Sequence, residues 1–148
     1  MKQIDFKKWN LIDAIDLSFI KDRMTRKYNW SKNRAENAIK RYKQYLYIVS
    51  EEEKGVCPTP DTDQVWHDHI LHTKKYMEHC ELIFGRFLHH QPFSSSEEKE
   101  NSSSSLLSDL GPKYFGDQYP TKTDEMVSVD CCSDDSECCS TLRTIQVE

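Results

Sequence analysis

The sequence contains no long apolar run and little glycine. Its 148 residues include four glycines and five prolines. It lacks the stretch of about 18 or more apolar residues that a membrane-spanning helix needs. The first residues, MKQIDFKKWNLIDAIDL, carry charges throughout and lack the apolar centre of a signal peptide. We therefore expect a cytoplasmic protein without membrane association, with secretion as an effector as the alternative.

An excess of basic charge is also absent. Residues 1–93 carry 16 Lys/Arg against 13 Asp/Glu, whereas residues 94–148 carry 4 against 12. The net charge of −5 disfavours nucleic-acid binding. The second part also holds 12 serines, and such a composition buries too little apolar surface to offset the entropy of ordering the chain.

Three parts follow from this composition. We expect a helical domain at 1–93, a linker with a short docking helix at 94–120, and a disordered Cys-containing tail at 121–148. Gly111-Pro112 interrupts the docking helix. Its apolar positions are Leu106, Leu107, Leu110, Tyr114 and Phe115.

The sequence lacks the paired CxxC motifs that are typical of structural zinc sites. The six cysteines are interpreted as thiols or metal ligands, because disulfides are rare in the cytoplasm. Four of them occur in CCSDDSECC near the C-terminus. These thiols either bind a soft metal such as copper(I) or zinc, belong to a redox-inert disordered tail, or serve as an attachment point.

Helical spacing of apolar residues predicts the first two helices. The first covers roughly 11–27, with an interruption near 16–18. The second begins after Ser31, whose hydroxyl is a suitable N-cap, and ends within 51–55. The apolar positions of the two helices are Leu11, Ile15, Phe19, Ile20, Met24, Ala35, Ile39, Tyr42, Leu46 and Val49.

The third predicted helix has the clearest start. Thr59 is a suitable cap and Pro60 suits the first helical position. The helix is expected to continue to Gln91-Pro92, with a bend permitted at Gly85. Its predicted core seam is Trp66, Ile70, Thr73, Met77, Cys80 and Phe84. Three helices with short connections indicate an all-α protein, a small antiparallel helical bundle.

Histidine is concentrated in this third helix. All six histidines lie between His67 and His90, three of them in VWHDHILHT. On a regular helix His67 and His69 project about 200° apart, so they cannot hold one ion together. Two pairs remain as ligands of a metal: Asp63 with His67, or His69 with His72.

A third ligand must come from elsewhere, because zinc and non-haem iron need three or four. His89 or His90 can supply it if Gly85 bends the helix back or if a second chain contributes. Glu36, Cys57 and the tail thiols are further candidates, whereas His79 lies too far along the helix from His72 to share its site. The predicted metal ligands are Asp63, His67, His69, His72, His89 and His90, with zinc favoured over iron.

Two other interpretations compete with a metal site. The histidines can form a structural network of hydrogen bonds with neighbouring helices, or they can act in catalysis. The sequence shows no nucleophile paired with a general base, so an enzyme is disfavoured. An interaction protein without metal is the alternative function, in which charged helix faces and the acidic tail recruit an unknown protein partner.

The motifs of the chain resemble those of a known family. WSKNRAENAIKRYKQYL, PTPDTDQVWHDHILHTKKYMEHCELIFGRFLHHQP and YFGDQYP are similar to the short bacterial proteins called glycine-rich domain-containing proteins, over roughly residues 11–120. The resemblance implies no known reaction. It carries over these motif positions: Asp63, Trp66, His67, His69, Thr73, Tyr76, Cys80, Gly85, His89 and His90.

The chain departs from this family at three places. His72 and His79 stand where the family usually has aspartates. HHQPFSSS replaces a more aromatic turn that contains glycine. The tail is poor in glycine, which separates it from the tails of the family.

Overall fold

The protein is an all-α helical bundle, as predicted. The computed structural model describes residues 2–53, 55–90 and 105–119. Two short strands pair in parallel, β1 with β2. The elements are α1 (Phe6–Asp13), α2 (Ser18–Arg26), α3 (Lys32–Glu51), β1 (Val56–Cys57), α4 (Pro60–Leu71), α5 (Thr73–Phe84), β2 (Ser105–Leu106), α7 (Leu107–Phe115) and the 3-10 turn η1 (Gly116–Gln118).

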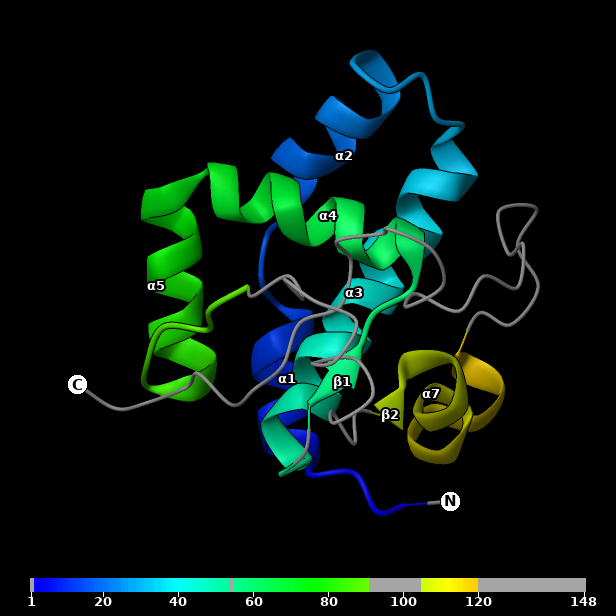
Figure 1. Ribbon diagram of the computed structural model, residues 1–148, viewed down its shortest axis with the longest axis vertical. Helices are drawn as coiled ribbons and strands as arrows, with labels where there is room; N and C mark the ends of the chain where they lie inside the picture. The colour runs from blue at the N-terminus through cyan, green and yellow to red at the C-terminus, as the bar shows by residue number, and fades with distance from the viewer. Residues whose placement is uncertain (1, 54, 91–104, 120–148) are drawn as a thin grey trace, which may run out of the picture.

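Helix α3 is the centre of the bundle (Figure 1). It begins where the sequence predicts, with the Ser31 hydroxyl accepting a hydrogen bond from the Arg34 amide at 3.1 Å. Helices α1, α2, α4 and α7 all contact it. Every residue of its second half from Arg41 to Val49 is buried except Lys43, so it carries more than the single buried face that was expected.

The first predicted helix is two helices. The interruption near 16–18 is confirmed, but α1 begins at Phe6, five residues before the predicted start. The carboxylate of Asp5 accepts hydrogen bonds from the first turn, a cap that fixes this earlier start. In α1 Ile12 is buried in the core, whereas Leu11 is 40% exposed.

The third predicted helix is also broken, and the prediction of a continuous helix was wrong. It splits at His72, whose ψ of 66° lies outside the helical range. Helices α4 and α5 therefore run in different directions (Figure 1). After the break the predicted seam holds only in part: Cys80 is buried and Phe84 packs against the core, but Thr73 and Met77 are exposed, and Tyr76 is buried instead. Gly85 does not bend the helix but ends it, in a left-handed conformation with φ of 68°.

Helix α7 packs against α3 on the side opposite α5 (Figure 1). Its residues Leu107, Leu110 and Tyr114 are buried. The helix runs through Gly111-Pro112, so the prediction that these residues interrupt it was wrong. The Gly111 backbone lies against the ring of Tyr119, where a Cβ would come within 2.2 Å. The predicted tail at 121–148 lies outside the described residues.

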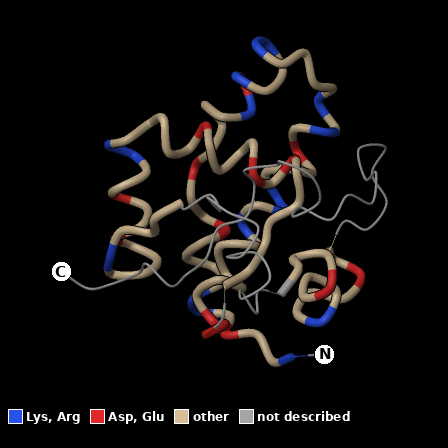
Figure 2. The backbone as a smooth tube through the Cα atoms, in the orientation of Figure 1, with Lys and Arg blue, Asp and Glu red and all other residues tan. Residues whose placement is uncertain are grey.

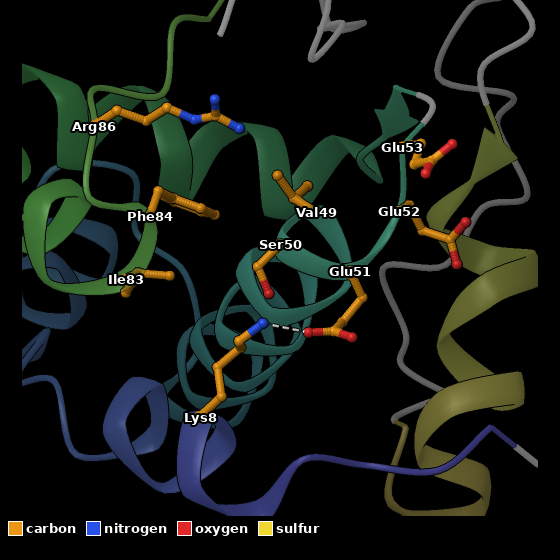
Figure 3. Close-up of a pocket in the computed structure, with 9 residues that line it drawn as sticks. All are labelled: Lys8, Val49, Ser50, Glu51, Glu52, Glu53, Ile83, Phe84 and Arg86. Atoms are coloured by element: carbon orange, nitrogen blue, oxygen red, sulfur yellow. Dashed lines mark hydrogen bonds and ion pairs between the residues drawn. The ribbon is translucent and has the colours of Figure 1, made fainter. Parts of the chain in front are cut away.

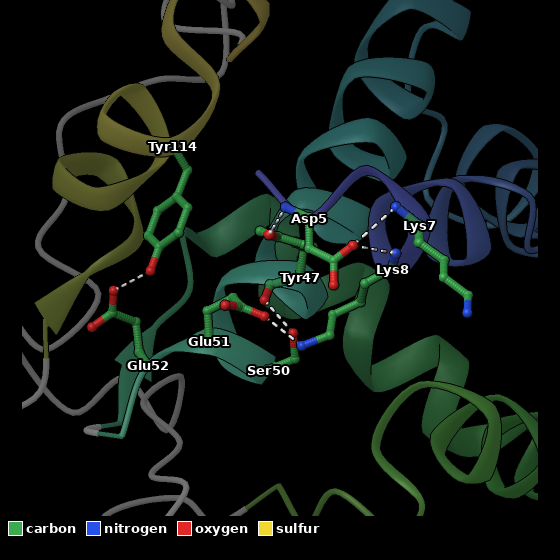
Figure 4. Close-up of polar contacts among 8 residues, drawn as sticks. All are labelled: Asp5, Lys7, Lys8, Tyr47, Ser50, Glu51, Glu52 and Tyr114. Atoms are coloured by element: carbon green, nitrogen blue, oxygen red, sulfur yellow. Dashed lines mark hydrogen bonds and ion pairs between the residues drawn. The ribbon is translucent and has the colours of Figure 1, made fainter. Parts of the chain in front are cut away.

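The end of α3 is held by polar contacts to both termini of the described bundle (Figure 4). The Tyr47 hydroxyl accepts a hydrogen bond from the Asp5 amide at 2.8 Å, and Lys8 forms an ion pair with Glu51. The Tyr114 hydroxyl donates to Glu52. Helices α1 and α7 are thereby both anchored at the C-terminal end of α3.

The two described cysteines differ from each other. Cys80 is a buried free thiol, and burial raises its pKa. Cys57 is disulfide-bonded, which corrects the expectation that it is a thiol or a metal ligand. The tail cysteines lie outside the described residues. Within the part of the chain that the structure describes, no helix is long and apolar enough to cross a membrane.

Candidate metal centre

Helix α4 carries three aspartates and no Lys or Arg (Figure 2). All three are buried: Asp61, Asp63 and Asp68. Burying a carboxylate is costly unless a cation or several hydrogen bonds compensate its charge. Each of the three must therefore have a compensating partner.

Arginines from neighbouring helices compensate two of these carboxylates. Arg34 of α3 reaches Asp61 with two nitrogens, at 2.9 and 3.1 Å. Arg23 of α2 donates its Nε–H to Asp68 at 2.7 Å. The third carboxylate, Asp63, faces two histidines instead.

The two histidines reach Asp63 from different parts of the chain. His67 lies one turn further along α4, and its Nε2 is 3.3 Å from Oδ2 of Asp63. His90 lies beyond α5, where Gly85 ends the helix and lets the chain return to α4. Its Nε2 is 2.8 Å from Oδ1 of Asp63.

The donor atoms of the three residues converge on one point. Nε2 of His67 and Nε2 of His90 are 2.9 Å apart, and Asp63, His67 and His90 are the group among the described residues whose ligand atoms lie within 4.8 Å of one another. Ligands about 2.0–2.1 Å from a tetrahedral zinc ion lie about 3.3 Å from each other. The two imidazole nitrogens are 2.9 Å apart and contact different oxygens of Asp63, at 2.8 Å from Oδ1 and 3.3 Å from Oδ2, so a bound ion would require the ligands to separate by a few tenths of an ångström.

The cluster lies at the edge of the core. The side chains of Asp63 and His90 are 7% and 9% exposed, whereas that of His67 is 44% exposed. One side of the cluster therefore opens to solvent. Three protein ligands with an exposed flank leave room for water or another molecule as a further ligand.

His69 belongs to a second, separate cluster. It is 1% exposed; its Nδ1 lies 2.7 Å from the Tyr42 hydroxyl and its Nε2 lies 2.8 Å from Nδ1 of His79. Burial, with the nearby His79 and His72, lowers the pKa of His69 to about 3. Burial also lowers the pKa of His79. A neutral His69 donates from one ring nitrogen and accepts at the other, so it links Tyr42 to His79.

The sequence missed the contact between His69 and His79. On a continuous helix the two rings would be about 15 Å apart along the axis. The break at His72 turns α5 so that His79 meets α4. No spacing in the sequence indicated this contact, because the predicted seam passed through Thr73 and Met77 and not through Tyr76.

The other predicted ligands lie apart from both Asp63 and each other. His72 is at the junction of α4 and α5, with its Nδ1 2.7 Å from the Asp68 carbonyl oxygen. His89 is exposed, and its ring packs on Phe87. Glu36 of α3 forms an ion pair with Lys21 of α2.

A cavity of about 380 Å³ lies away from the histidines (Figure 3). Val49, Ile83 and Phe84 form its apolar wall, and charged side chains form its rim. The ion pair between Lys8 and Glu51 lies at this rim. The cavity contains no histidine or cysteine, so it is not a metal site of the zinc kind.

Fold and cluster together define a small all-α protein with a His/Asp triad that reaches solvent only at His67. The chain belongs to the UCP032817-like family, whose model matches residues 7–109.

Two plant proteins show a more distant similarity. Glycine-rich domain-containing protein 2 of Arabidopsis thaliana is 32% identical over 69 residues, and glycine-rich domain-containing protein 1 is 33% identical over 69 residues. Each match covers 43% of this chain but only 9% and 8% of the plant proteins. The chain thus spans less than a tenth of their length. No solved structure matches. These matches support the expected glycine-rich domain family.

Proposed function

We propose that this protein is a metal-binding helical module in which Asp63, His67 and His90 hold one divalent cation. The observation that carries the proposal is the charge balance of α4. Arginines neutralise Asp61 and Asp68, whereas Asp63 has only imidazole nitrogens beside it among the described residues. A divalent cation between the three donor atoms compensates this buried charge.

Hydrogen bonding alone accounts less well for the cluster. Nε2 of an imidazole offers either one hydrogen or one lone pair. Nε2 of His90 nevertheless faces both Oδ1 of Asp63 and Nε2 of His67, at 2.8 and 2.9 Å. A metal ion at the shared point satisfies all three donor atoms at once.

The donor set favours zinc, with iron as the second choice. Two imidazoles and one carboxylate occur in zinc sites that keep a fourth position open, and the same set with open positions binds non-haem iron(II). The exposed flank at His67 fits either ion. Zinc does not change its oxidation state, which suits a metal with a structural or regulatory role.

Elemental analysis of the purified full-length chain tests the proposal. We expect about one zinc or iron per chain, lost in His67→Ala and retained in His72→Ala. A variant in which serine replaces Cys131, Cys132, Cys138 and Cys139 shows whether the tail binds metal instead. Metal that stays in His67→Ala and disappears from the serine variant would contradict the proposal.

An interaction protein without metal is the second candidate. Leu71, Met77 and Leu82 are 65%, 57% and 53% exposed on α4 and α5, and exposed apolar side chains favour contact with a partner. Absence of any metal from the wild-type chain would favour this function. The cytoplasmic location, the bacterial origin and the identity of a partner stay predictions.

A further inference from the structure

The described part of the segment that carries His90, from Gly85 to His90, contains no helix or strand. It begins at Gly85, and Phe87 and His89 are exposed. Leu88 between them is only 1% exposed. The position of His90 therefore depends on what holds the backbone of Leu88.

Two side chains of α5 hold that backbone. The Tyr76 hydroxyl donates a hydrogen bond to the Leu88 carbonyl oxygen. The Leu88 backbone also hydrogen-bonds with the thiol of Cys80. Tyr76 and Cys80 are one helical turn apart and both are buried, so they fix Leu88 against one face of α5.

Trp66 connects this contact to the metal ligands. Its Nε1–H donates to the Tyr76 hydroxyl at 2.9 Å. Its indole ring also packs on the ring of His90, with the centroids 4.3 Å apart. Trp66 lies on α4 between Asp63 and His67. It therefore joins the helix that supplies these two ligands to the segment that carries His90.

We propose that Tyr76 is a positioning residue of the metal site: its hydroxyl holds Leu88 and thereby keeps Nε2 of His90 directed at Asp63. This role rests on the proposed metal binding. A ligand on a segment without regular structure must be ordered when the ion binds, unless other contacts have ordered it beforehand. Removing such an outer contact typically weakens metal binding by about 10–100-fold.

Tyr76→Phe tests the role, because it removes one oxygen and keeps the ring that packs on His69 and Phe87. Tyr47→Phe is the matched control, since Tyr47 is also fully buried and its hydroxyl also bonds a backbone group of another segment, at Asp5. Zinc affinity of the full-length chain is measured by competition with a chromophoric chelator.

We expect zinc binding to weaken at least about tenfold in Tyr76→Phe and to stay unchanged in Tyr47→Phe. Unchanged affinity in Tyr76→Phe, or an equal loss in both variants, would overturn the positioning role. If Tyr76→Phe does not fold, Trp66→Phe is used, which keeps an aromatic ring beside His90 but removes the donor to Tyr76. It should weaken zinc binding in the same way, and unchanged affinity would overturn the role.

A measurement without metal separates this role from the proposed function. In the metal-free chain, a nuclear Overhauser effect between the rings of Trp66 and His90 reports the position of His90. We expect this signal to disappear in Tyr76→Phe and to persist in Tyr47→Phe. If the wild-type chain binds no zinc, metal binding fails, and the signal alone decides the role of Tyr76. Its persistence in both variants would overturn that role.

Discussion

Nε2 of His90 lies 2.8 Å from Oδ1 of Asp63, although 27 residues separate them in the chain. One continuous helix would place the two residues roughly 40 Å apart. The break at His72 and the left-handed Gly85 together reverse the chain, so that the residue after α5 returns to the start of α4. The cluster thus depends on two changes of chain direction, one at His72 and one at Gly85.

Trp66→Ala should destabilise the protein far more than His67→Ala. Trp66 is 1% exposed and packs on Tyr45 and His90, and loss of a core aromatic typically costs about 3–5 kcal/mol. His67 is about half exposed, at 44%, so its removal from the metal-free chain should cost no more than about 1 kcal/mol. Urea unfolding in the presence of a chelator measures both. Equal losses would mean that His67 has a structural role.

Gly111→Ala should destabilise the protein, although alanine is the better helix former. Helix propensity alone predicts a gain of about 0.5–1 kcal/mol. The new Cβ would lie 2.2 Å from the ring of Tyr119, and overpacking of this kind costs about 1–3 kcal/mol. Thermal unfolding of Gly111→Ala, with Ser108→Ala at an exposed position of α7 as the control, measures the difference. A rise in Tm for Gly111→Ala would show that Tyr119 does not pack there.

Local sequence signals predicted the starts of α3 and α4, but not that of α1, whose Asp5 cap was missed. Ser31 and Pro60 begin α3 and α4 where the capping rules indicate, because a cap depends on the few residues around it. The break at His72 gave no such signal, since neither glycine nor proline stands there. Apolar spacing continued through Thr73 and Met77, and only packing against α4 selects the face with Tyr76 instead.

The candidate site was predictable only in part, for the same reason. The helical angle between His67 and His69 correctly separates them, and the structure gives them different neighbours. Whether His89 or His90 contacts Asp63 depends on the path of the segment after Gly85, which the sequence does not determine. His79 contacts His69 because the helix breaks at His72. Residue spacing on a single continuous helix cannot predict such a contact.

The stability of the metal-free protein should fall as the pH decreases below about 6.5. Burial lowers the pKa of His69 from 6.5 to about 3. Between these values the unfolded chain binds the proton and the folded chain does not, so folding becomes less favourable as the pH falls and changes no further on this account below about 3. The slope should approach about 1.4 kcal/mol per pH unit.

His69→Gln isolates this contribution. The variant cannot take up the proton, so its stability should depend less on pH than that of the wild type. The comparison is made by urea unfolding between about pH 5 and 6.5, where most carboxylates stay ionised. The same slope in both proteins would mean that His69 is protonated in the folded state.

Zinc should stabilise the wild-type chain and His89→Ala but not His90→Ala. The two histidines are neighbours on one segment, yet only His90 reaches Asp63, whereas His89 packs on Phe87 at the surface. Zinc at 100 times its dissociation constant stabilises the folded state by about 2.7 kcal/mol, because it binds that state alone. For a chain of this length that is roughly 5–10 °C in Tm.

Differential scanning calorimetry with and without zinc measures this shift. Each variant is compared with itself, so a change in its intrinsic stability does not affect the result. A zinc-dependent rise in His90→Ala equal to that of the wild type would remove His90 from the ligands. A rise that is lost in His89→Ala but kept in His90→Ala would mean that the segment after Gly85 lies in a different register against α4, with the neighbouring imidazole directed at Asp63.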